Sequence, residues 1–322
     1  MERPPLTRTR GVLAIAVITT LTSFAVPTRL LSQQPALFRG HVDLVNVGVT
    51  VADKKRQLIT DLDARDFAVY EDGRLQTIFA FARGEQAGPP LHVGVLLDVS
   101  GSQEHDLPFT QTAAIRFQTM LSDAVDMTFI DFADEVRTSR FPRSDLAQLN
   151  ERVRELRARG GTALYDAIGT YLDGAAAQDG RKIMVLYTDG GDTQSSLDLN
   201  ELMKLLKASE VTVYAIGALH NQPPFAQGAQ RAILTDIAEA TGGVAFFPKG
   251  VKDLDRIYEQ VLGEVRAQYT IGYLSTNEKT DGVWRKLEVK ITRPDSKNLR
   301  IRARKGYYAP KARPDQASVS AK

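Results

Sequence analysis

Three short polar motifs contain the side chains of this 322-residue chain that are best suited to binding a metal ion. The motifs are Asp98-Val99-Ser100-Gly101-Ser102, Gly160-Gly161-Thr162 and Thr188-Asp189-Gly190. Oxygen ligands without imidazole or thiolate favour Mg²⁺ or Mn²⁺, and less strongly Ca²⁺, over zinc or copper. We therefore predict a divalent-metal site with five ligands or ligand-holding residues, namely Asp98, Ser100, Ser102, Thr162 and Asp189.

The spacing within the first motif suits such a site. Asp98, Ser100 and Ser102 alternate with other residues, so one tight loop can direct all three side chains inward. Two carboxylates roughly neutralise a divalent ion. Neutral hydroxyls leave that ion electrophilic enough to accept one more anionic ligand from outside.

Two apolar runs position these motifs. His92 to Leu97 ends at Asp98, and Ile183 to Tyr187 ends at Thr188. Continuous apolar runs of this length are typical of strands buried on both faces of a parallel sheet. Ligands of open α/β sheets bind outside the carboxyl ends of the strands, so we expect the motifs to meet there.

The wider pattern predicts a doubly wound, mainly parallel α/β domain over residues 91–266. Further strands are expected at Met127–Phe132, Val211–Ile216 and Val244–Phe247. Helices are expected after Asp106, its predicted N-cap, and over 145–157 and 163–177. Strands separated by helices imply parallel pairing with helices on both faces.

In the segments on either side, 38–84 and 267–310, apolar residues alternate with other residues, as is typical of strands. Each offers only about three strands, and small sheets need a partner face. We therefore expect the two flanks to form one β-sandwich into which the α/β domain is inserted. The polar residues 311–322 are expected to be a disordered tail.

The N-terminus has the features of a secretory leader, which we assign to residues 1–34. Arg3, Arg8 and Arg10 precede an apolar run from Gly11 to Val26. Near the end of this run, Ser23 and Ala25 provide small residues for a signal-peptidase cleavage site. The alternative is an uncleaved anchor. Either way we expect an exported protein of the periplasm, cell envelope or extracellular space. The absence of cysteine excludes disulfides and thiolate sites.

The formal net charge of +2 is small for this length, so the overall electrostatic field does not indicate that the chain binds nucleic acid. The basic residues at 300, 302, 304 and 305 are interpreted as the solvated face of a strand. The membrane is expected to be contacted only if the N-terminal anchor is retained.

Residues 91–266 resemble von Willebrand factor A domains, and the three motifs resemble their metal-ion-dependent adhesion site. The resemblance implies that Ser100 and Ser102 bind the metal directly and that Thr162 binds directly or through water. It implies that Asp98 and Asp189 act through waters or hold the other ligands, and that a partner's carboxylate completes the shell. The flanks resemble a bacterial group of exported relatives through Asp66-Phe67, Glu71-Asp72-Gly73, Gln268-Tyr269-Thr270-Ile271-Gly272-Tyr273 and Arg304-Lys305-Gly306-Tyr307-Tyr308.

The predicted function is metal-dependent binding of another, unidentified protein in the cell envelope, without enzymatic activity. One alternative is a structural envelope scaffold whose metal holds loops together. The other is a metal-assisted hydrolase, which is disfavoured because no nucleophile elbow, phosphate loop or dinucleotide fingerprint is present.

Other polar residues are weaker candidates. Asp192 is interpreted as a solvated loop carboxylate rather than a second ligand. His105 lies close to the metal loop in sequence and could touch a ligand. Asp61, Asp63 and Asp66 resemble the start of a calcium loop but lack its glycine and glutamate, so they are interpreted as turn residues.

Overall fold

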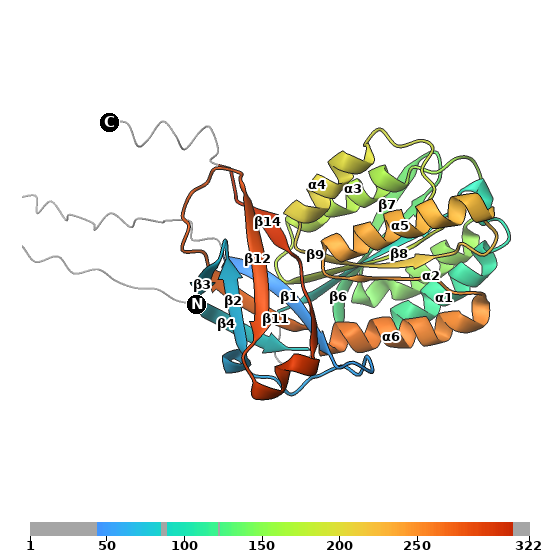
Figure 1. Ribbon diagram of the computed structural model, residues 1–322. Coiled ribbons are helices and arrows are strands. Elements are labelled where there is room, and N and C mark those ends of the chain that lie inside the picture. Colours follow the sequence, from blue (N-terminus) through green and yellow to red (C-terminus); the bar gives the residue numbers. More distant parts are fainter. Residues whose placement is uncertain (1–43, 85–88, 122, 312–322) are drawn as a thin grey trace, which may run out of the picture. The chain divides into compact units, whose positions relative to one another are not determined.

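The computed structural model describes residues 44–84, 89–121 and 123–311, so the predicted leader and the predicted tail after Lys311 lie outside the described residues. The described part contains one six-stranded sheet and two four-stranded sheets (Figure 1). The α-helices of this part pack on both faces of the six-stranded sheet. This arrangement confirms the predicted α/β domain.

The six-stranded sheet has the order β10-β9-β8-β5-β6-β7. Its strands are β5 (Leu91–Asp98), β6 (Ala124–Phe132), β7 (Val136–Pro142), β8 (Arg181–Thr188), β9 (Val211–Gly217) and β10 (Val244–Phe246). All neighbours pair in parallel except β6 and β7. Every residue of β5 and β8 is buried, as their apolar runs predict.

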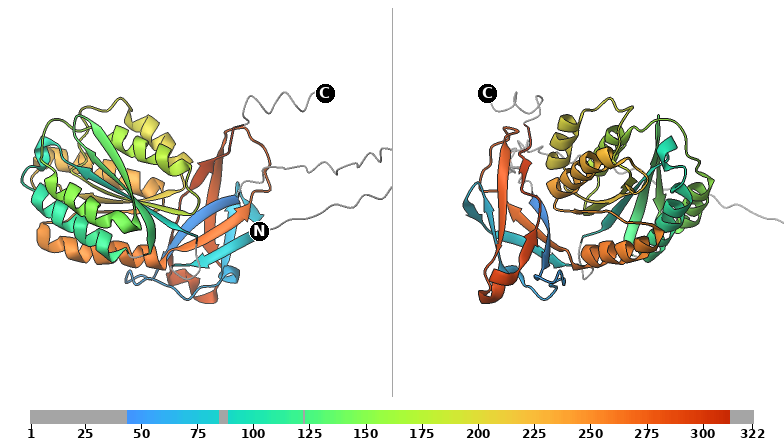
Figure 2. Two further views of the ribbon diagram at one scale, coloured as in Figure 1. Left: turned by 180° about the vertical axis from the view of Figure 1, so that it is seen from behind. Right: turned by 45° about the vertical axis from the view of Figure 1, so that its right-hand side comes forward.

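Three helices cover each face of this sheet (Figure 2). One face packs against α1 (Leu107–Met120), α2 (Leu146–Glu155) and α6 (Leu254–Ala267). The other face packs against α3 (Leu164–Ala176), α4 (Leu199–Ala208) and α5 (Pro224–Ala240). Side chains of β5 alternate between the two cores: Val95 and Leu97 face the first, and Leu96 faces the second.

The antiparallel edge strand β7 was not predicted from the sequence. Its side chains are half-buried or exposed along its whole length, because it lies at the edge of the sheet. An edge strand needs no continuous apolar run, so the signal that identified β5 and β8 is missing here. The sheet is therefore mainly, not wholly, parallel.

Strands from before and after the α/β domain mix in both four-stranded sheets, whose orders are β13-β1-β11-β4 and β14-β12-β2-β3. The N-terminal strands are β1 (Leu44–Ala52), β2 (Phe67–Glu71), β3 (Arg74–Gln76) and β4 (Ile78–Arg83). The C-terminal strands are β11 (Tyr269–Leu274), β12 (Trp284–Ile291), β13 (Arg300–Arg302) and β14 (Gly306–Tyr308). Both sheets contribute to one apolar core, so the predicted β-sandwich with an inserted α/β domain is confirmed.

A two-residue hairpin at Asp72 and Gly73 follows β2. Asp72 and Gly73 both have positive φ, 47° and 81°, as a two-residue hairpin requires. That hairpin joins β2 to the short β3, whereas β4 pairs with β11 in the other sheet. The chain therefore changes sheets between Gln76 and Ile78.

The basic residues near the C-terminus do not form one solvated face, so that prediction is wrong for Arg304. Its side chain is buried, and its guanidinium donates to the backbone carbonyls of Asn46 at 2.6 Å and Ser209 at 3.2 Å. These carbonyls take the place of water around the buried charge.

Within the described residues, no helix has the length and apolar character needed to cross a membrane.

Candidate metal centre

The first motif forms a tight loop at the carboxyl end of β5. Asp98 is the last residue of the strand, and Ser102 lies in a short 3-10 helix, Gly101–Gln103. The backbone N–H of Ser100 donates to Asp98 Oδ1 at 2.9 Å, and the two serine Oγ atoms lie 3.1 Å apart. Asp98 and Ser100 are each 1% exposed, whereas Ser102 is exposed. The loop therefore places a buried serine and an exposed serine side by side.

The second carboxylate comes from the end of β8. The hydroxyl of Ser102 donates to Asp189 Oδ2 at 2.6 Å, and the N–H of Gly191 donates to Asp189 Oδ1 at 2.9 Å. Thr188 Oγ1 donates to Asp98 Oδ2 at 2.7 Å, which joins the two strand ends directly. Neighbouring parallel strands β5 and β8 thus bring together four of the five predicted residues, as expected for one edge of a sheet.

The Thr162 loop reaches the same edge through its backbone. The N–H of Gly101 donates to the carbonyl of Gly160 at 3.0 Å, and the N–H of Arg159 donates to the carbonyl of Val99 at 2.8 Å. Gly160 has a φ of 65°, a conformation that suits glycine. Thr162 is 6% exposed, and among the described residues its side chain has no hydrogen bond to the other four. Backbone hydrogen bonds therefore join its loop to the loop of the first motif.

Three site residues were not predicted from the sequence. Thr188 is the hydroxyl donor to Asp98, and Gln103 and Gln222 donate their side-chain N–H groups to Asp189 Oδ2 at 2.9 and 2.7 Å. Thr188 is already part of the third motif, and Gln103 directly follows the first motif, so both stand where the sequence pattern points. Gln222 precedes α5, and nothing in the local sequence links it to the site.

Burial governs the electrostatics of the centre. It raises the pKa of Asp98 from 3.8 to about 7, against hydrogen bonds from Ser100 and Thr188 that lower the pKa, and the nearby charge of Asp189 adds to the increase. A cation beside these carboxylates would favour their charged forms. Two nearly buried carboxylates with adjoining hydroxyls are thus a donor set that fits Mg²⁺ or Mn²⁺.

The hydroxyls are essential to this fit. Within the described residues, no group of three or more histidine, cysteine or acidic side chains could hold a metal ion. A site at this edge would depend on serine and threonine oxygens as well as on the two aspartates.

The weaker candidates serve other purposes. Asp192 accepts from the N–H of Tyr165 at 3.2 Å and the hydroxyl of Ser195 at 2.5 Å, which fastens its loop to α3. His105 is exposed. Asp66 accepts from the N–H of Asp63 at 2.7 Å, consistent with a turn.

Asp106 stands at the predicted N-cap of α1, but its side chain makes no capping hydrogen bond. Its carboxylate instead contacts His220 Nε2 at 3.1 Å and accepts from Asn221 Nδ2 at 3.0 Å. Asp106 is therefore the N-cap residue of α1, as predicted, but it makes no capping hydrogen bond, because the loop before α5 supplies other donors to its carboxylate.

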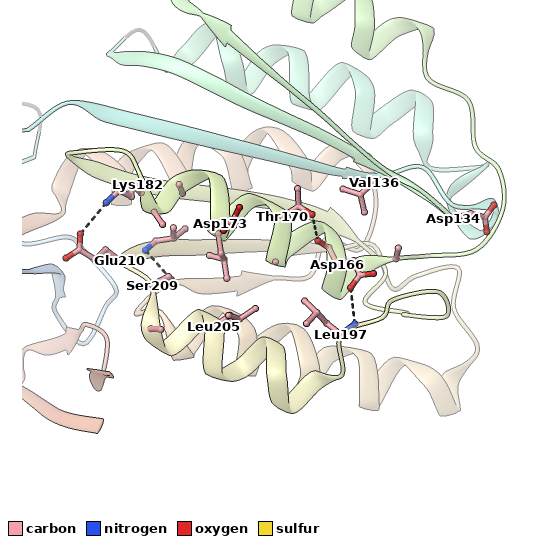
Figure 3. Close-up of a pocket in the computed structure, with 17 residues that line it drawn as sticks. Asp134, Val136, Asp166, Thr170, Asp173, Lys182, Leu197, Leu205, Ser209 and Glu210 are labelled. Carbon is pink, nitrogen blue, oxygen red and sulfur yellow. Dashed lines mark hydrogen bonds and ion pairs between the residues drawn. The ribbon is translucent and has the colours of Figure 1, made fainter. Parts of the chain in front are cut away.

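A groove lies between α3 and α4 (Figure 3). It has a volume of about 950 Å³, and none of the five predicted metal residues lines it. Asp166 stands at one end, where its carboxylate accepts from the N–H of Leu197 at 2.9 Å. Lys182 and Glu210 pair at 3.3 Å toward the other end. The lining also includes Ala163 and Asp134, and Asp134 accepts from the N–H of Gly161 at 2.6 Å, so one end of the groove borders the Thr162 loop.

The family model of the von Willebrand factor type A domain matches residues 92–260, just over half of the chain. No curated protein matches the sequence. Among solved structures, a von Willebrand factor type A protein from Catenulispora acidiphila is similar with 14% identity and a TM-score of 0.48, over 85% of this chain and 75% of that one.

Two smaller structures are similar over part of the chain. The BatB protein from Bacteroides thetaiotaomicron has 17% identity and a TM-score of 0.41, over 53% of this chain and 97% of that one. The von Willebrand factor domain of the pilus tip protein Mfa5 from Porphyromonas gingivalis has 13% identity and a TM-score of 0.43, over 55% and 96%.

Proposed function

The chain belongs to the von Willebrand factor type A family, and from that premise we propose that it is a binding module that holds another protein through a divalent metal ion. The observation that carries the proposal is the contact between Ser102 and Asp189. A hydroxyl that donates its proton to a carboxylate turns its lone pairs toward other partners, so a cation would take the place of the Ser100 hydroxyl that now lies 3.1 Å from Ser102 Oγ. In this proposal, Ser100, Ser102 and Thr162 supply the neutral oxygens, and Asp98 and Asp189 supply the charge.

The bound ion would supply one electrophilic position for a carboxylate of the partner. Mg²⁺ or Mn²⁺ suits this role better than Ca²⁺, because three hydroxyls and two carboxylates form a small, compact set. The exposure of Ser102 supports an ion that is open to the outside. The alternative, a structural scaffold with a closed ion, would need Ser102 to be covered.

Exposed aromatic residues near these loops support protein binding. Phe225, in the first turn of α5, is 86% exposed, and Phe109, in the first turn of α1, is 45% exposed. Both helices begin after loops at the carboxyl edge of the sheet, the same edge that carries Asp98 and Asp189. Aromatic side chains are enriched at protein interfaces, so these two offer an apolar margin beside the metal.

We place this activity in the cell envelope or outside the cell. The support is the leader pattern of the first 34 residues, with its arginines, apolar run and small residues.

The experiment that tests the function compares the chain with its Asp98→Asn variant, which has nearly the same shape but lacks the charge. Both are immobilised and exposed to envelope extract with Mg²⁺ or with chelator. We expect proteins that the unmodified chain retains in Mg²⁺, that chelator releases, and that the variant does not retain. Retention that is the same under all conditions would contradict the proposal and favour the scaffold.

A further inference from the structure

The groove between α3 and α4, which we name the α3–α4 groove, has two helices as its walls (Figure 3). Asp166 and Leu197 lie at one end, where both helices begin. Ala176 and Ser209 lie at the other end, where both helices stop, so α3 and α4 run in the same direction along the groove. The stretch of α3 from Asp166 to Ala176 spans roughly 15 Å at the rise of an α-helix.

The lining of the groove is mainly apolar. Its larger apolar members are Val136, Leu172, Leu197, Leu205 and Val211. Leu205 is 41% exposed, which leaves a large apolar side chain of α4 in contact with water. Gly169, Ala176 and Ala208 also line the groove, and these small residues let a bound segment approach the two helix backbones closely. A partner that fills the groove would therefore remove apolar surface from water.

The helical walls decide which kind of segment fits. The backbone N–H groups and carbonyls inside α3 and α4 pair within each helix, so the walls offer no strand edge to a partner. An extended segment in the groove would leave its own backbone polar groups without partners, which is costly in apolar surroundings. A helix pairs these groups internally, and its side chains fit between the rows of side chains on two neighbouring helices. The groove therefore favours a helical occupant.

The charge of the groove is negative. Four carboxylates line it, those of Asp134, Asp166, Asp173 and Glu210, and Lys182 is the basic residue of the lining. The lining thus has a net charge of −3, four carboxylates less one ammonium, whereas the whole chain has +2. Asp173 is exposed, and it follows Asp166 by two helical turns, so both carboxylates lie on the same side of α3. This charge is complementary to a segment with basic side chains at the same spacing.

We propose that the α3–α4 groove binds an amphipathic helix of a partner protein, with an apolar face and with Lys or Arg side chains two turns apart opposite Asp166 and Asp173. The apolar face covers Leu205, and the basic side chains pair with the carboxylates at the margin. The carboxyl ends of α3 and α4 add partial negative charge at one end of the groove. None of the five predicted metal residues lines the groove, so this binding needs no metal ion.

The test uses a synthetic helical peptide as the probe. The peptide has leucine along one face, alanine and glutamine elsewhere, and two lysines, two turns apart, beside the leucine face. A twin peptide carries glutamate in place of both lysines. Fluorescence anisotropy measures the affinity of each labelled peptide for the chain in the presence of chelator. We expect the lysine peptide to bind about tenfold or more tightly than its twin, because like charges oppose binding.

Two variants with exposed substitution sites assign the binding to this groove. Leu205→Gln keeps the size of the side chain but makes it polar, and we expect it to weaken binding of the lysine peptide about fivefold or more. Asp173→Asn removes one charge and should weaken binding about twofold to fivefold, the effect of an exposed ion pair. Glu259→Gln is the matched control, because it removes an exposed carboxylate from α6, on the opposite face of the sheet, and should leave the affinity unchanged.

Several results would overturn the inference. They are the absence of binding by the lysine peptide, equal affinity for the two peptides, and equal affinity of the unmodified chain and both groove variants. Ultracentrifugation covers another occupant: a dimer of the chain that Leu205→Gln separates into monomers would assign the groove to a second copy and contradict the proposal. Because every peptide titration contains chelator, these outcomes are independent of the proposed metal-dependent function.

Discussion

The carboxylate of Glu71 accepts a hydrogen bond from the hydroxyl of Tyr273 at 2.7 Å, although 202 residues separate them in the sequence. Tyr307 and Ser275 also donate to this carboxylate, at 2.9 and 2.6 Å. Glu71 is only 2% exposed, so these hydroxyls replace the water that a buried charge has lost. The contact joins β2, before the α/β domain, to β11, after it, and thereby fastens the two halves of the sandwich.

Removal of this donor should weaken the sandwich. We expect Tyr273→Phe to lower the free energy of unfolding by about 1.5–3 kcal/mol, the value of a hydrogen bond to a buried charge. Tyr70→Phe is the control, because the Tyr70 ring lies over Lys290 and its hydroxyl is not part of this network. Denaturant unfolding measures both variants. Equal stability of the two would show that the Glu71 network contributes nothing.

Metal should stabilise the fold if the centre binds it. At Mg²⁺ a hundredfold above the dissociation constant, we expect an increase of about 2.7 kcal/mol in the free energy of unfolding, which chelator reverses. Asp98→Asn should show no such increase. Thermal melting with Mg²⁺ and with chelator checks this, and a shift that persists in the variant would place the ion elsewhere.

The affinity for Mg²⁺ should depend on pH through Asp98, whose pKa burial raises to about 7. Below that pH the carboxyl is protonated and must lose its proton before the ion binds. Affinity should therefore fall by about tenfold per pH unit below 7 and level off above it. Calorimetric titrations between pH 5.5 and 8, roughly spanning this transition, measure the effect. A flat profile would mean that Asp98 takes no part.

Without metal, the raised pKa of Asp98 makes the stability of the fold decrease as the pH rises, whereas it makes the affinity for Mg²⁺ increase. Above pH 3.8 the unfolded chain loses a proton that folded Asp98 retains up to about pH 7. The contribution of Asp98 to stability is therefore full below 3.8 and falls as the pH rises through this window. Asp98→Asn should lack this fall, which denaturant unfolding in chelator can measure.

A substitution at Gly94 in β5 can test how closely α3 packs on the sheet. A Cβ atom at this position would lie 2.2 Å from Cε2 of Tyr171. We expect Gly94→Ala to destabilise the domain by about 1–3 kcal/mol through overpacking. Gly174→Ala is the matched control, because its Cβ would meet nothing within 4 Å and helix propensity favours alanine by about 0.5–1 kcal/mol. Loss of stability in both variants would contradict this account.

Phe225 should matter for the partner and not for the metal. Its ring is 86% exposed, so Phe225→Ala removes little packing inside the domain. We expect Mg²⁺ affinity to stay unchanged while retention of partner proteins falls about tenfold or more, the effect of losing an interface anchor. Undiminished retention would show that the partner does not touch this helix.

The sequence alone determined the α/β domain and which side chains gather at its edge. The apolar runs before Asp98 and Thr188 identify two buried strands, and parallel neighbours must bring their carboxyl ends together. The alternation of the flanks likewise predicted the sandwich. These features follow from local patterns and from the connectivity rules of parallel sheets, so no knowledge of distant contacts is needed.

Only the tertiary structure decided which side chains donate hydrogen bonds to each carboxylate. Gln222 reaches Asp189 across 33 residues, and Glu71 meets Tyr273 across 202. The edge strand β7, with its polar and half-buried side chains, was also invisible in the sequence. A hydrogen bond between loops depends on how the helices and strands beneath them pack. The residues that form the bond follow no periodic sequence pattern, so the sequence does not reveal the contact. The sequence therefore identified the carboxylates, and the fold identified the side chains that hold them.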